Sequence, residues 1–481
     1  MTELAAPVLT AAVVLPLAAA LAAIRVRQDS HAQRVTVAAI GASLLLGVEA
    51  VREVMSTGGS LLPERWMWLG WEWFAVDGLS AVLMVLFPAL ALVTLLAAPR
   101  RDVDRRFLIT ALVIVSGTLA TYSSQNLLVF LAGWTVSLLP FLMRGRHGPW
   151  FAISRFTMMG SAGALCVAIT INGMSAAGAG QADWFSMAGL SHGAGNPWVF
   201  GALVSAAVLR TGIFPAHRSV AASLGAGAVL LSTLLMNAQM GLFLMARLAI
   251  PLFRDMAAEV LPWLFGLALF TCLYMAVLGL AERKPGALLA TVFVSQSAGL
   301  FAGLLTATAE GVTGALLQWI VLTVCATVLT VVHRCLQART DGHAGEEAYM
   351  GLAARTPRFA AFFAVSALAL VGMPGTLGFS GEDLLMHGAL SVHPWLGAAL
   401  PIAIALNAYH VFRLFARLFL GKESGSLSSV PDALPRERWA LSACLVALVW
   451  LGVAPAQAVY LRAPAARAIL GHAPAAESHF P

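Results

Sequence analysis

Charged residues are scarce in this sequence. Asp, Glu, Lys and Arg make up only 11% of its 481 residues, whereas hydrophobic residues make up 59% and the mean hydropathy is +0.83. A water-soluble fold needs more polar surface than this composition supplies, so the solvent around most of the chain must be lipid. The apolar runs are about twenty residues long, which fits helices and excludes the alternating strands of a barrel. The composition therefore predicts an all-α membrane protein.

Motifs for metal binding and catalysis are also absent. We find no nucleotide-binding glycine loop, no nucleophile elbow and no zinc motif. No cysteine spacing typical of a disulfide framework or a metal site occurs. We therefore expect no cofactor, no metal and no catalytic residue in this chain. The cysteines lie singly in or beside apolar runs, where they are expected to pack between helices: Cys166, Cys272, Cys325, Cys335 and Cys444.

The first apolar stretch, Pro7 to Val26, lacks the features of a signal peptide. No Lys or Arg precedes it and no small-residue cleavage site follows it, so we expect a retained helix. Thirteen further windows are long enough to span a bilayer. The fourteen windows lie near residues 7–26, 33–51, 75–98, 106–124, 126–143, 150–174, 198–216, 221–248, 259–281, 285–305, 311–333, 357–391, 395–420 and 438–461.

The basic residues give the orientation, because cytoplasmic loops of membrane proteins carry an excess of Lys and Arg. Assigning the loops alternately to two sides puts 22 of the 29 Lys and Arg residues on one side and six on the other, with Arg210 within the membrane. The bias predicts a multi-pass protein with both termini on the outer side. We expect the membrane to be a bacterial inner membrane, whose outer side is periplasmic. The bias also explains the net charge of +6 without a nucleic-acid partner.

Two helices carry a repeated pattern. The segments Asn237 to Leu248 and Asn407 to Leu418 share Asn, Ala, Leu, Ala, Arg and Leu at equal spacing. The loop count places Arg247 outside and Arg417 inside, which is the combination that an inverted-topology duplication produces. The alternative is a chance match between two Leu- and Ala-rich helices.

Two windows contain residues that interrupt helices. The seventh includes Arg210-Thr-Gly-Ile-Phe-Pro-Ala-His217, and the twelfth includes Gly372-Met-Pro-Gly-Thr-Leu-Gly-Phe-Ser-Gly-Glu-Asp383. Proline and clustered glycine break the helical hydrogen-bond ladder, and broken backbone at membrane depth is tolerated where it lines protein or a wet cavity. Breaks at matching positions of two halves predict a transport site.

The charged residues at membrane depth are the first candidates for an ion pathway, because burying a charge there is costly. Glu382 and Asp383 follow the glycine-rich break, where they could carry a proton or bind a cation. The alternative is that they complement the dipole at a helix start. Arg210 could be a fixed cation in a polar channel, or it could extend to the cytoplasmic face.

Uncharged and histidine side chains form the second group of candidates. His217, His387 and His410 could relay protons, since a histidine titrates near neutral pH, although a single histidine is more often a hydrogen-bonded packing residue. Polar residues recur in otherwise apolar helices, which favours a polar axis over isolated contacts between helices. These residues are Thr135, Asn237, Gln239, Ser295, Gln296, Gln318, Thr323 and Asn407.

Residues 75–425 resemble the antiporter-like proton-conducting subunits of complex I, a family that includes the large Mrp antiporter subunits and the DabB subunits of inorganic-carbon pumps. The resemblance rests on Asn126-Leu-Leu-Val-Phe-Leu-Ala-Gly-Trp134, Phe214-Pro-Ala-His217, Glu282-Arg-Lys284 with Ser295-Gln296, and Gly372-Met-Pro-Gly-Thr-Leu-Gly-Phe379 with Gly381-Glu382. It implies fourteen helices with two inverted five-helix repeats. The chain then divides into 1–105 (helices 1–3), 106–248 (first repeat), 249–425 (second repeat) and 426–481 (helix 14 and an external tail).

This sequence departs from the respiratory members at several positions. The Glu that follows the fifth-helix Trp is Thr135 here, the seventh-helix Lys is Arg210, and the eighth-helix Lys is Asn237. The eleventh-helix region, 318–327, has no His, Lys or acidic side chain, and only the twelfth-helix acid, Glu382, is kept. Because Arg, Thr and Asn do not exchange protons at accessible pH, the usual first-half chain is broken.

An Asn at the eighth-helix Lys position resembles the DabB branch better than the respiratory one. That resemblance implies a zinc-containing, carbonic-anhydrase-like partner, DabA, on the cytoplasmic face, and coupling of a proton or sodium gradient to inorganic-carbon uptake. We therefore interpret the chain as the ion-translocating subunit of an inorganic-carbon accumulating complex. The alternatives are a subunit of a respiratory, hydrogenase or Mrp-type complex, and a paralogue that anchors its partners without conducting.

Overall fold

The computed structural model describes residues 7–26, 28–57, 61–64, 67–68, 71–142, 149–178, 180, 185–187, 190, 195–225, 229–340, 349–422 and 430–471. Within these residues, ten helices are long and apolar enough to cross a bilayer, or eleven if the bent C-terminal pair counts as one span. The strands described are four two-residue segments. The protein is an all-α, multi-pass membrane protein, as its composition predicts. The total of fourteen spans stays a prediction.

The N-terminal part contains three long helices and two short antiparallel ribbons. The third helix begins with a capping box, because the Asp77 side chain accepts a hydrogen bond from the Ser80 amide while the Ser80 hydroxyl accepts one from the Asp77 amide. Strand β1 pairs with β4, and β2 pairs with β3. The elements are α1 (Val8–Arg25), α2 (Asp29–Ser56), β1 (Leu62–Pro63), β2 (Met67–Trp68), β3 (Trp71–Glu72), β4 (Ala75–Val76), α3 (Gly78–Ala97) and the 3-10 turn η1 (Arg100–Asp102).

The regular elements described in the rest of the chain are helices. The middle part contains α4 (Arg105–Ser123), α5 (Leu127–Leu142), α6 (Pro149–Gly178), α7 (Pro197–Thr211), α8 (His217–Gly225), α9 (Val229–Asn237), α10 (Met240–Leu244), the π-helical segment η3 (Met245–Ala249), α11 (Ile250–Leu252), α12 (Arg254–Ala281), α13 (Pro285–Leu305) and α14 (Ala309–Arg339). The last part contains η4 (Leu352–Ala354), α15 (Pro357–Leu370), α16 (Leu377–Val392), α17 (Pro394–Gly397), α18 (Ala399–Phe419), α19 (Pro435–Val453) and α20 (Pro455–Leu470).

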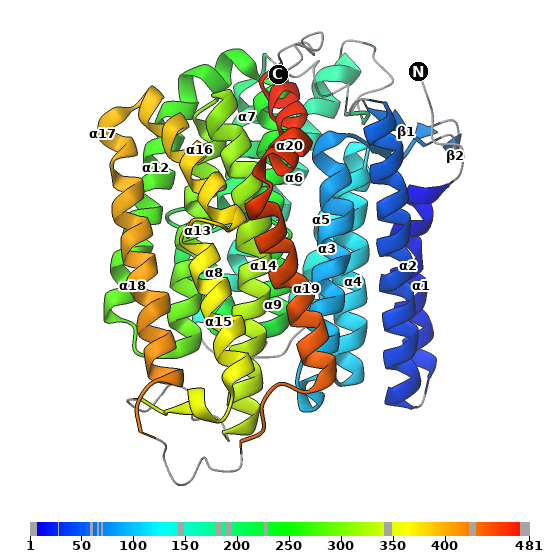
Figure 1. Ribbon diagram of the computed structural model, residues 1–481. Helices are drawn as coiled ribbons and strands as arrows, with labels where there is room; N and C mark the ends of the chain where they lie inside the picture. The colour runs from blue at the N-terminus through cyan, green and yellow to red at the C-terminus, as the bar shows by residue number, and fades with distance from the viewer. Residues whose placement is uncertain are drawn as a thin grey trace.

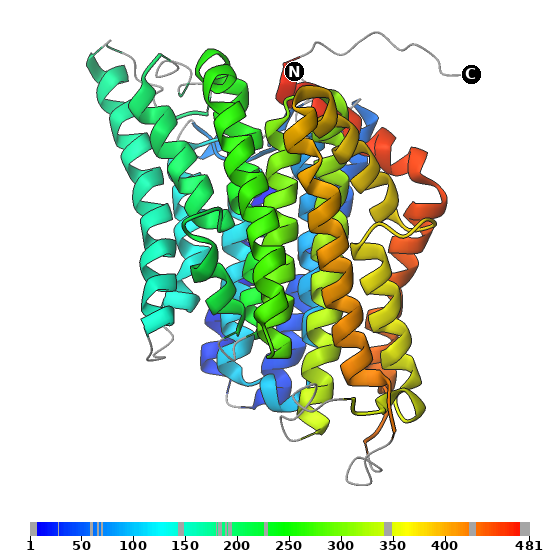
Figure 2. The same ribbon diagram turned by 90° about the vertical axis from the view of Figure 1, so that its left-hand side faces the viewer.

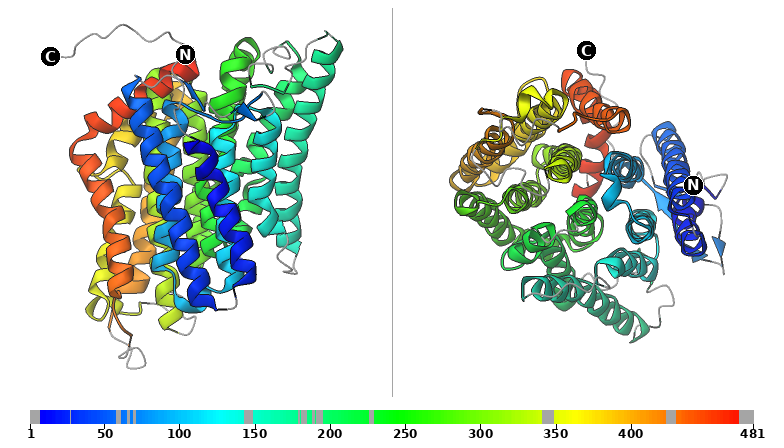
Figure 3. Two further views of the ribbon diagram at one scale, coloured as in Figure 1. Left: turned by 90° about the vertical axis from the view of Figure 1, so that its right-hand side faces the viewer. Right: turned by 90° about the horizontal axis from the view of Figure 1, so that it is seen from below.

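The long helices run side by side, with α1 and α2 at one edge of the bundle and α18 at the opposite edge (Figure 1). Helices α6 and α7 form another edge, which Figure 2 shows in teal and green at its left. Helices α13 and α14 are the core, since the most apolar window of each is completely buried. Seen from below, α14 is surrounded by other helices (Figure 3). It contacts α3, α9, α13, α15, α16 and α20, so it touches both halves of the chain.

Both helix interruptions expected from the sequence are present. Helix α7 ends at Thr211 and α8 begins at His217, with Gly212 in the left-handed region at φ 82°. Helix α15 ends at Leu370 and α16 begins at Leu377, with two glycines of the intervening turn at φ 70° and 87°. Glycine adopts these angles without the steric cost that a Cβ atom brings. The breaks lie between helices of the bundle, where neighbouring helices supply partners for the freed backbone.

Two windows are wrong as continuous helices. Within the eighth window, α9 ends at Asn237, and α10 begins at Met240 after Gln239 adopts a left-handed backbone at φ 42°. Within the last window, α19 and α20 meet at a bend of 88°. Pro455 begins α20, and since proline lacks the amide that would continue the ladder, the helix stops before it. Neither bend changes the apolar character of the residues, so hydropathy does not reveal it.

Candidate functional site

Glu382 lies in the second turn of α16, directly after the break, and its side chain turns back toward that break. Gln318 of α14 donates a hydrogen bond from Nε2 to Glu382 Oε1 over 3.3 Å. A Cβ atom added at Gly372 would overlap Glu382 Oε2, so the glycine makes room for the carboxyl group. The candidate carboxylate thus contacts an amide from one central helix and the unwound backbone of its own span.

Helix α13 connects this break to the rest of the polar interior. Its residues Ser295, Gln296 and Ser297 are consecutive, so they point about 100° apart around the helix. Gln296 Nε2 donates to the carbonyl oxygen of Leu370, the last residue before the break, over 3.3 Å. Ser295 accepts a hydrogen bond from Asn407 Nδ2 over 2.9 Å.

The third of these residues reaches the first half of the chain. Ser297 accepts a hydrogen bond from Gln239 Nε2 over 2.7 Å, at the unexpected break between α9 and α10. A left-handed non-glycine residue costs about 1–2 kcal/mol and is found where the surroundings fix it, often at functional sites. Beside it, Asn237 Nδ2 donates to Thr327 of α14 over 2.8 Å. The structure thus brings Asn237, Gln239, Gln296 and Asn407 into one set of contacts around the two central helices.

Arg210 is a buried cation in the first half. Its side chain does not reach a face of the bundle, because only 7% of the residue is exposed. Nη2 donates to the Ser137 hydroxyl over 3.1 Å, and the guanidinium lies 5.4 Å from the centre of the Trp134 ring. Within the described part of the chain, no carboxylate forms an ion pair with it. Thr135, at the position of the usual acid, instead donates to Leu131 O of its own helix over 2.8 Å.

The histidines divide between the interior and the surface. His217 is 4% exposed and stacks on Phe214 with ring centres 5.4 Å apart, while His410 is fully buried and its Nε2 donates to Ala276 O over 2.6 Å. His387 is exposed and pairs with Asp383 over 3.5 Å, and 47% of the Asp383 side chain is exposed. Asp383 and His387 are therefore not brought to Glu382, although the sequence places Asp383 beside it.

Several interior polar residues were missed from the sequence. The Tyr122 hydroxyl donates to the carbonyl oxygen of Ala238 at the α9/α10 break. His333 of α14 is 1% exposed, and neither of its ring nitrogens has a partner among the residues that the structure describes. The signal for both was available, because each is a lone titratable side chain at the end of an apolar run.

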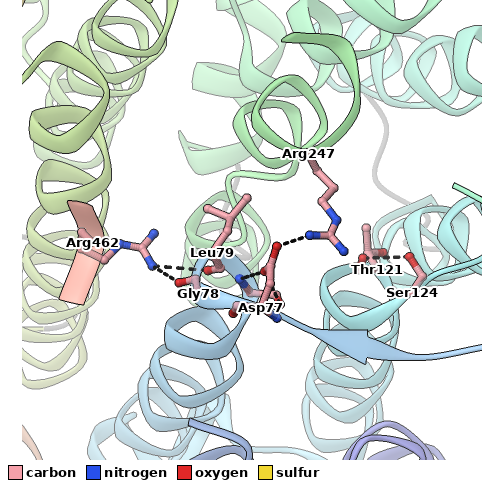
Figure 4. Close-up of polar contacts among 8 residues, drawn as sticks. Asp77, Gly78, Leu79, Thr121, Ser124, Arg247 and Arg462 are labelled. Atoms are coloured by element: carbon pink, nitrogen blue, oxygen red, sulfur yellow. Dashed lines mark hydrogen bonds and ion pairs between the residues drawn. The ribbon is translucent and has the colours of Figure 1, made fainter. Parts of the chain in front are cut away.

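A second polar cluster surrounds the start of α3 (Figure 4). Asp77 forms an ion pair with Arg247 of the π-helical segment. Arg462 of α20 is fully buried, and its Nη1 donates to the carbonyl oxygens of Gly78 and Leu79, each over 3.3 Å. The sequence places Arg247 within the eighth window and Arg462 directly after the last window. In the structure α20 continues to Leu470, so Arg462 belongs to a helix, and the two arginines tie α20 and the eighth span to α3.

The chemistry open to these sites is narrow. In the described ranges, no group of three or more His, Cys, Asp and Glu side chains could hold a metal ion. Around the central helices α13 and α14, the described residues include the Glu382 carboxylate beside an amide, the buried Arg210 guanidinium, and a series of hydroxyl, amide and imidazole groups. Such a set can pass a proton through a hydrated interior.

The fold and the site define a multi-span helical membrane protein whose broken helices surround a polar interior. The family described as "NADH:quinone oxidoreductase/Mrp antiporter, TM" matches residues 124–406, more than half of the chain. The chain therefore belongs to this family. NADH-quinone oxidoreductase subunit 13 of Thermus thermophilus is 29% identical to it over 456 residues, covering 86% of this chain and 93% of that protein.

Solved structures show the same fold. A chain of respiratory complex I from Thermus thermophilus with bound NADH matches with a TM-score of 0.84 at 24% identity, covering 96% of this chain and 99% of that one. A chain of the Mrp complex from Dietzia sp. matches with a TM-score of 0.82 at 17% identity, covering 98% of each. The resemblance to antiporter-like subunits is thus confirmed. These relatives favour the respiratory or Mrp-type alternative over the inorganic-carbon interpretation.

Proposed function

We propose that the chain is a proton-translocating, antiporter-like subunit of a respiratory-type complex in a bacterial inner membrane. Glu382 carries the ion in the second half, with Gln318 orienting its carboxyl group. Arg210 supplies a fixed positive charge in the first half. Asn237, Gln296, Asn407, His217 and His410 line the polar interior, whereas the exposed residues Asp383 and His387 take no part.

One observation carries this proposal: Glu382 lies at a break in a membrane helix, and an amide of α14, one of the two fully buried helices, donates a hydrogen bond to it. Burying an ionisable carboxyl group within a membrane protein is energetically unfavourable. Such residues are rare there and usually have a function. The serine and glutamine residues of α13 support it, since they connect this break to the α9/α10 break in the other half. Water between these side chains would complete the path.

The experiment replaces Glu382 with Gln in the assembled complex and measures proton pumping in membrane vesicles. Glutamine keeps the shape of the side chain but cannot release a proton, so coupled transport should be lost while the amount of assembled protein stays unchanged. The matched control is Asp383→Asn, which changes the adjacent acid on the exposed face. Full transport by Glu382→Gln would reject an ion-carrying role for this carboxyl group and favour a subunit that anchors its partners without conducting.

A second candidate is a DabB-like subunit that couples a proton or sodium gradient to inorganic-carbon accumulation with a DabA-like zinc partner. The observation that favours it is at the eighth-helix Lys position, which is Asn237 here. Asn237 donates a hydrogen bond to Thr327, so this position holds an uncharged pair of side chains and no group that exchanges protons. Purification of the intact complex discriminates the two. A zinc-containing, carbonic-anhydrase-like protein in equimolar amount supports the carbon pump, and quinone-oxidoreductase subunits support the respiratory complex.

We further propose the inverted arrangement of residues 106–248 and 249–425, with both termini on the periplasmic side. In both repeated segments an asparagine donates to a hydroxyl group of α13 or α14 and leaves its Oδ1 atom without a partner in the described part of the chain.

Single cysteines at Arg283 and at Gly195, on a cysteine-free background, test the orientation. Labelling of position 283 from the periplasm would reject it.

A further inference from the structure

Three helix ends meet at the lower end of the bundle in Figure 1: the end of α3, the end of α14 and the start of α19. A pocket of about 500 Å³ lies between them. Its apolar lining includes Pro99, Ala338 and Leu434. The volume is in the range of sites that hold small ligands. None of these residues belongs to the polar interior described above.

The charged lining of this pocket is predominantly basic. Arg100, Arg101, Arg339 and Arg436 line it together with a single acid, Glu437. That acid is already engaged, because it accepts two hydrogen bonds from Arg339 Nη2, over 2.9 and 2.7 Å. It also accepts one from the Leu434 amide at the start of α19. The pocket therefore has an excess of positive charge that the described residues do not neutralise.

Two of the arginines are held in place and two are free. Arg339 is fixed by Glu437 and by the Phe359 ring, whose centre lies 4.8 Å from its guanidinium carbon, and Arg436 Nη2 donates to Ala98 O over 3.1 Å. The exposed side chains of Arg100 and Arg101 have no hydrogen bond or ion pair with the part of the chain that the structure describes. Guanidinium groups bind phosphate oxygens with two parallel hydrogen bonds, so this set suits a phosphate group.

The level of the pocket in the membrane follows from Trp439. This side chain is 72% exposed on α19, close to the pocket residue Glu437, and the Arg438 guanidinium carbon lies 5.9 Å from the centre of its ring. Exposed tryptophans beside arginines are typical of the boundary between lipid and water. The pocket thus lies at the depth of the lipid headgroups.

We propose that this pocket binds the phosphate group of an anionic phospholipid. Arg339 and Arg436 form the fixed part of the site, and Arg100 and Arg101 close on the headgroup from the exposed side. Basic pockets between helix ends on the cytoplasmic side of membrane proteins bind anionic headgroups in this way. Free phosphate shares the same chemistry, but the apolar lining and the depth given by Trp439 favour a lipid.

The test titrates the detergent-solubilised full chain with phosphatidylglycerol, phosphatidylcholine or inorganic phosphate and counts bound molecules by native mass spectrometry. We expect phosphatidylglycerol to bind at least about tenfold more tightly than phosphatidylcholine. The double variant Arg100→Gln, Arg101→Gln should lose about tenfold of that affinity. Its thermal unfolding without lipid should be unchanged, because neither side chain has a hydrogen bond or ion pair with a described residue.

The matched control is the double variant Arg283→Gln, Lys284→Gln, which removes two exposed basic residues at the same end of the bundle but away from the pocket. It should bind phosphatidylglycerol as the original chain does. An equal loss in both double variants would show attraction by general charge and overturn the proposal, as would unchanged binding in Arg100→Gln, Arg101→Gln. If inorganic phosphate at millimolar concentration displaces the lipid, the proposal of a lipid site is rejected and the site binds free phosphate.

Discussion

Gln318 and Glu382 lie on different helices, and one hydrogen bond of 3.3 Å joins them at the break of the twelfth span. The amide group of Gln318 suits both protonation states of the carboxyl group. Its Nε2 donates to the carboxylate, while its Oε1 has no partner in the described residues and can accept a hydrogen bond from the protonated acid. The pair can therefore keep its geometry while the proton moves.

The first prediction concerns this hydrogen bond. Gln318→Leu should lower coupled proton transport by roughly tenfold or more, because a hydrogen bond to a charged group contributes about 1.5–3 kcal/mol. The amount of assembled protein should change little, since leucine fits the apolar surroundings of α14. Transport in inverted membrane vesicles, normalised to protein content, is the measurement. The control is Thr323→Val on the same helix, whose hydroxyl bonds only to carbonyl groups of α14.

The second prediction separates backbone strain from the space that Glu382 needs. Gly372 and Gly375 both have positive φ angles, but only at Gly372 would a Cβ atom overlap the Glu382 carboxyl group. Gly375→Ala should therefore lower the free energy of unfolding only by the backbone strain, about 1–2 kcal/mol, and the variant should retain transport. Gly372→Ala should lose both stability and transport, as measured by thermal unfolding and pumping. Equal behaviour of the two variants would mean that the carboxyl group does not depend on the break.

The third prediction concerns the buried guanidinium of Arg210. Arg210→Lys keeps the charge next to Ser137 and Trp134 and should retain part of the transport activity, whereas Arg210→Ala should lose most of it. Removing the long side chain also leaves a cavity, so the alanine variant should be less stable by about 2–4 kcal/mol. Arg210→Met separates volume from charge, because it fills the space without the cation. Activity of Arg210→Met equal to that of Arg210→Lys would argue against a role for the charge.

The fourth prediction uses the ion pair between Asp77 and Arg247. Burial alone would raise the pKa of Asp77, but the Arg247 guanidinium and the Ser80 amide and hydroxyl together lower it below the usual value. An acid whose pKa is lowered in the folded state stabilises the fold above its unfolded pKa, near 3.9, and loses that contribution as the pH falls through the lowered value. The ion pair should therefore contribute fully at neutral pH.

Asp77→Asn tests this directly, since asparagine still caps α3 but carries no charge. It should lower the free energy of unfolding by about 2 kcal/mol at neutral pH, and the difference should shrink below about pH 4. Chemical denaturation in detergent across that pH range is the measurement. Glu49→Gln is the matched control, because the Glu49–Arg52 pair is exposed and screened by solvent, so its loss should change the stability little at any pH. A pH-independent difference for Asp77→Asn would exclude an electrostatic origin.

Much of the second-half site follows from local sequence. Gly372, Pro374 and Gly375 predict a break because their backbone preferences oppose a helix wherever they occur. Glu382 follows as the acid next to that break. The contact with Gln318 does not follow, because the two residues are 64 positions apart in the chain. Asp383 shows the limit clearly, since a neighbour on a helix points about 100° away and only packing decides which of the two faces the interior.

The sequence by itself determined that the chain lies in a membrane, that its seventh and twelfth windows are interrupted, and that Glu382 is the acid nearest a break. Composition and backbone preference are local properties, so no fold is needed to read them. Only the tertiary structure decided that Gln239 breaks the eighth window, that α20 turns away at Pro455, and that Arg210 is buried. These depend on which distant helices satisfy the freed backbone and the charged groups, and that information lies in packing between helices.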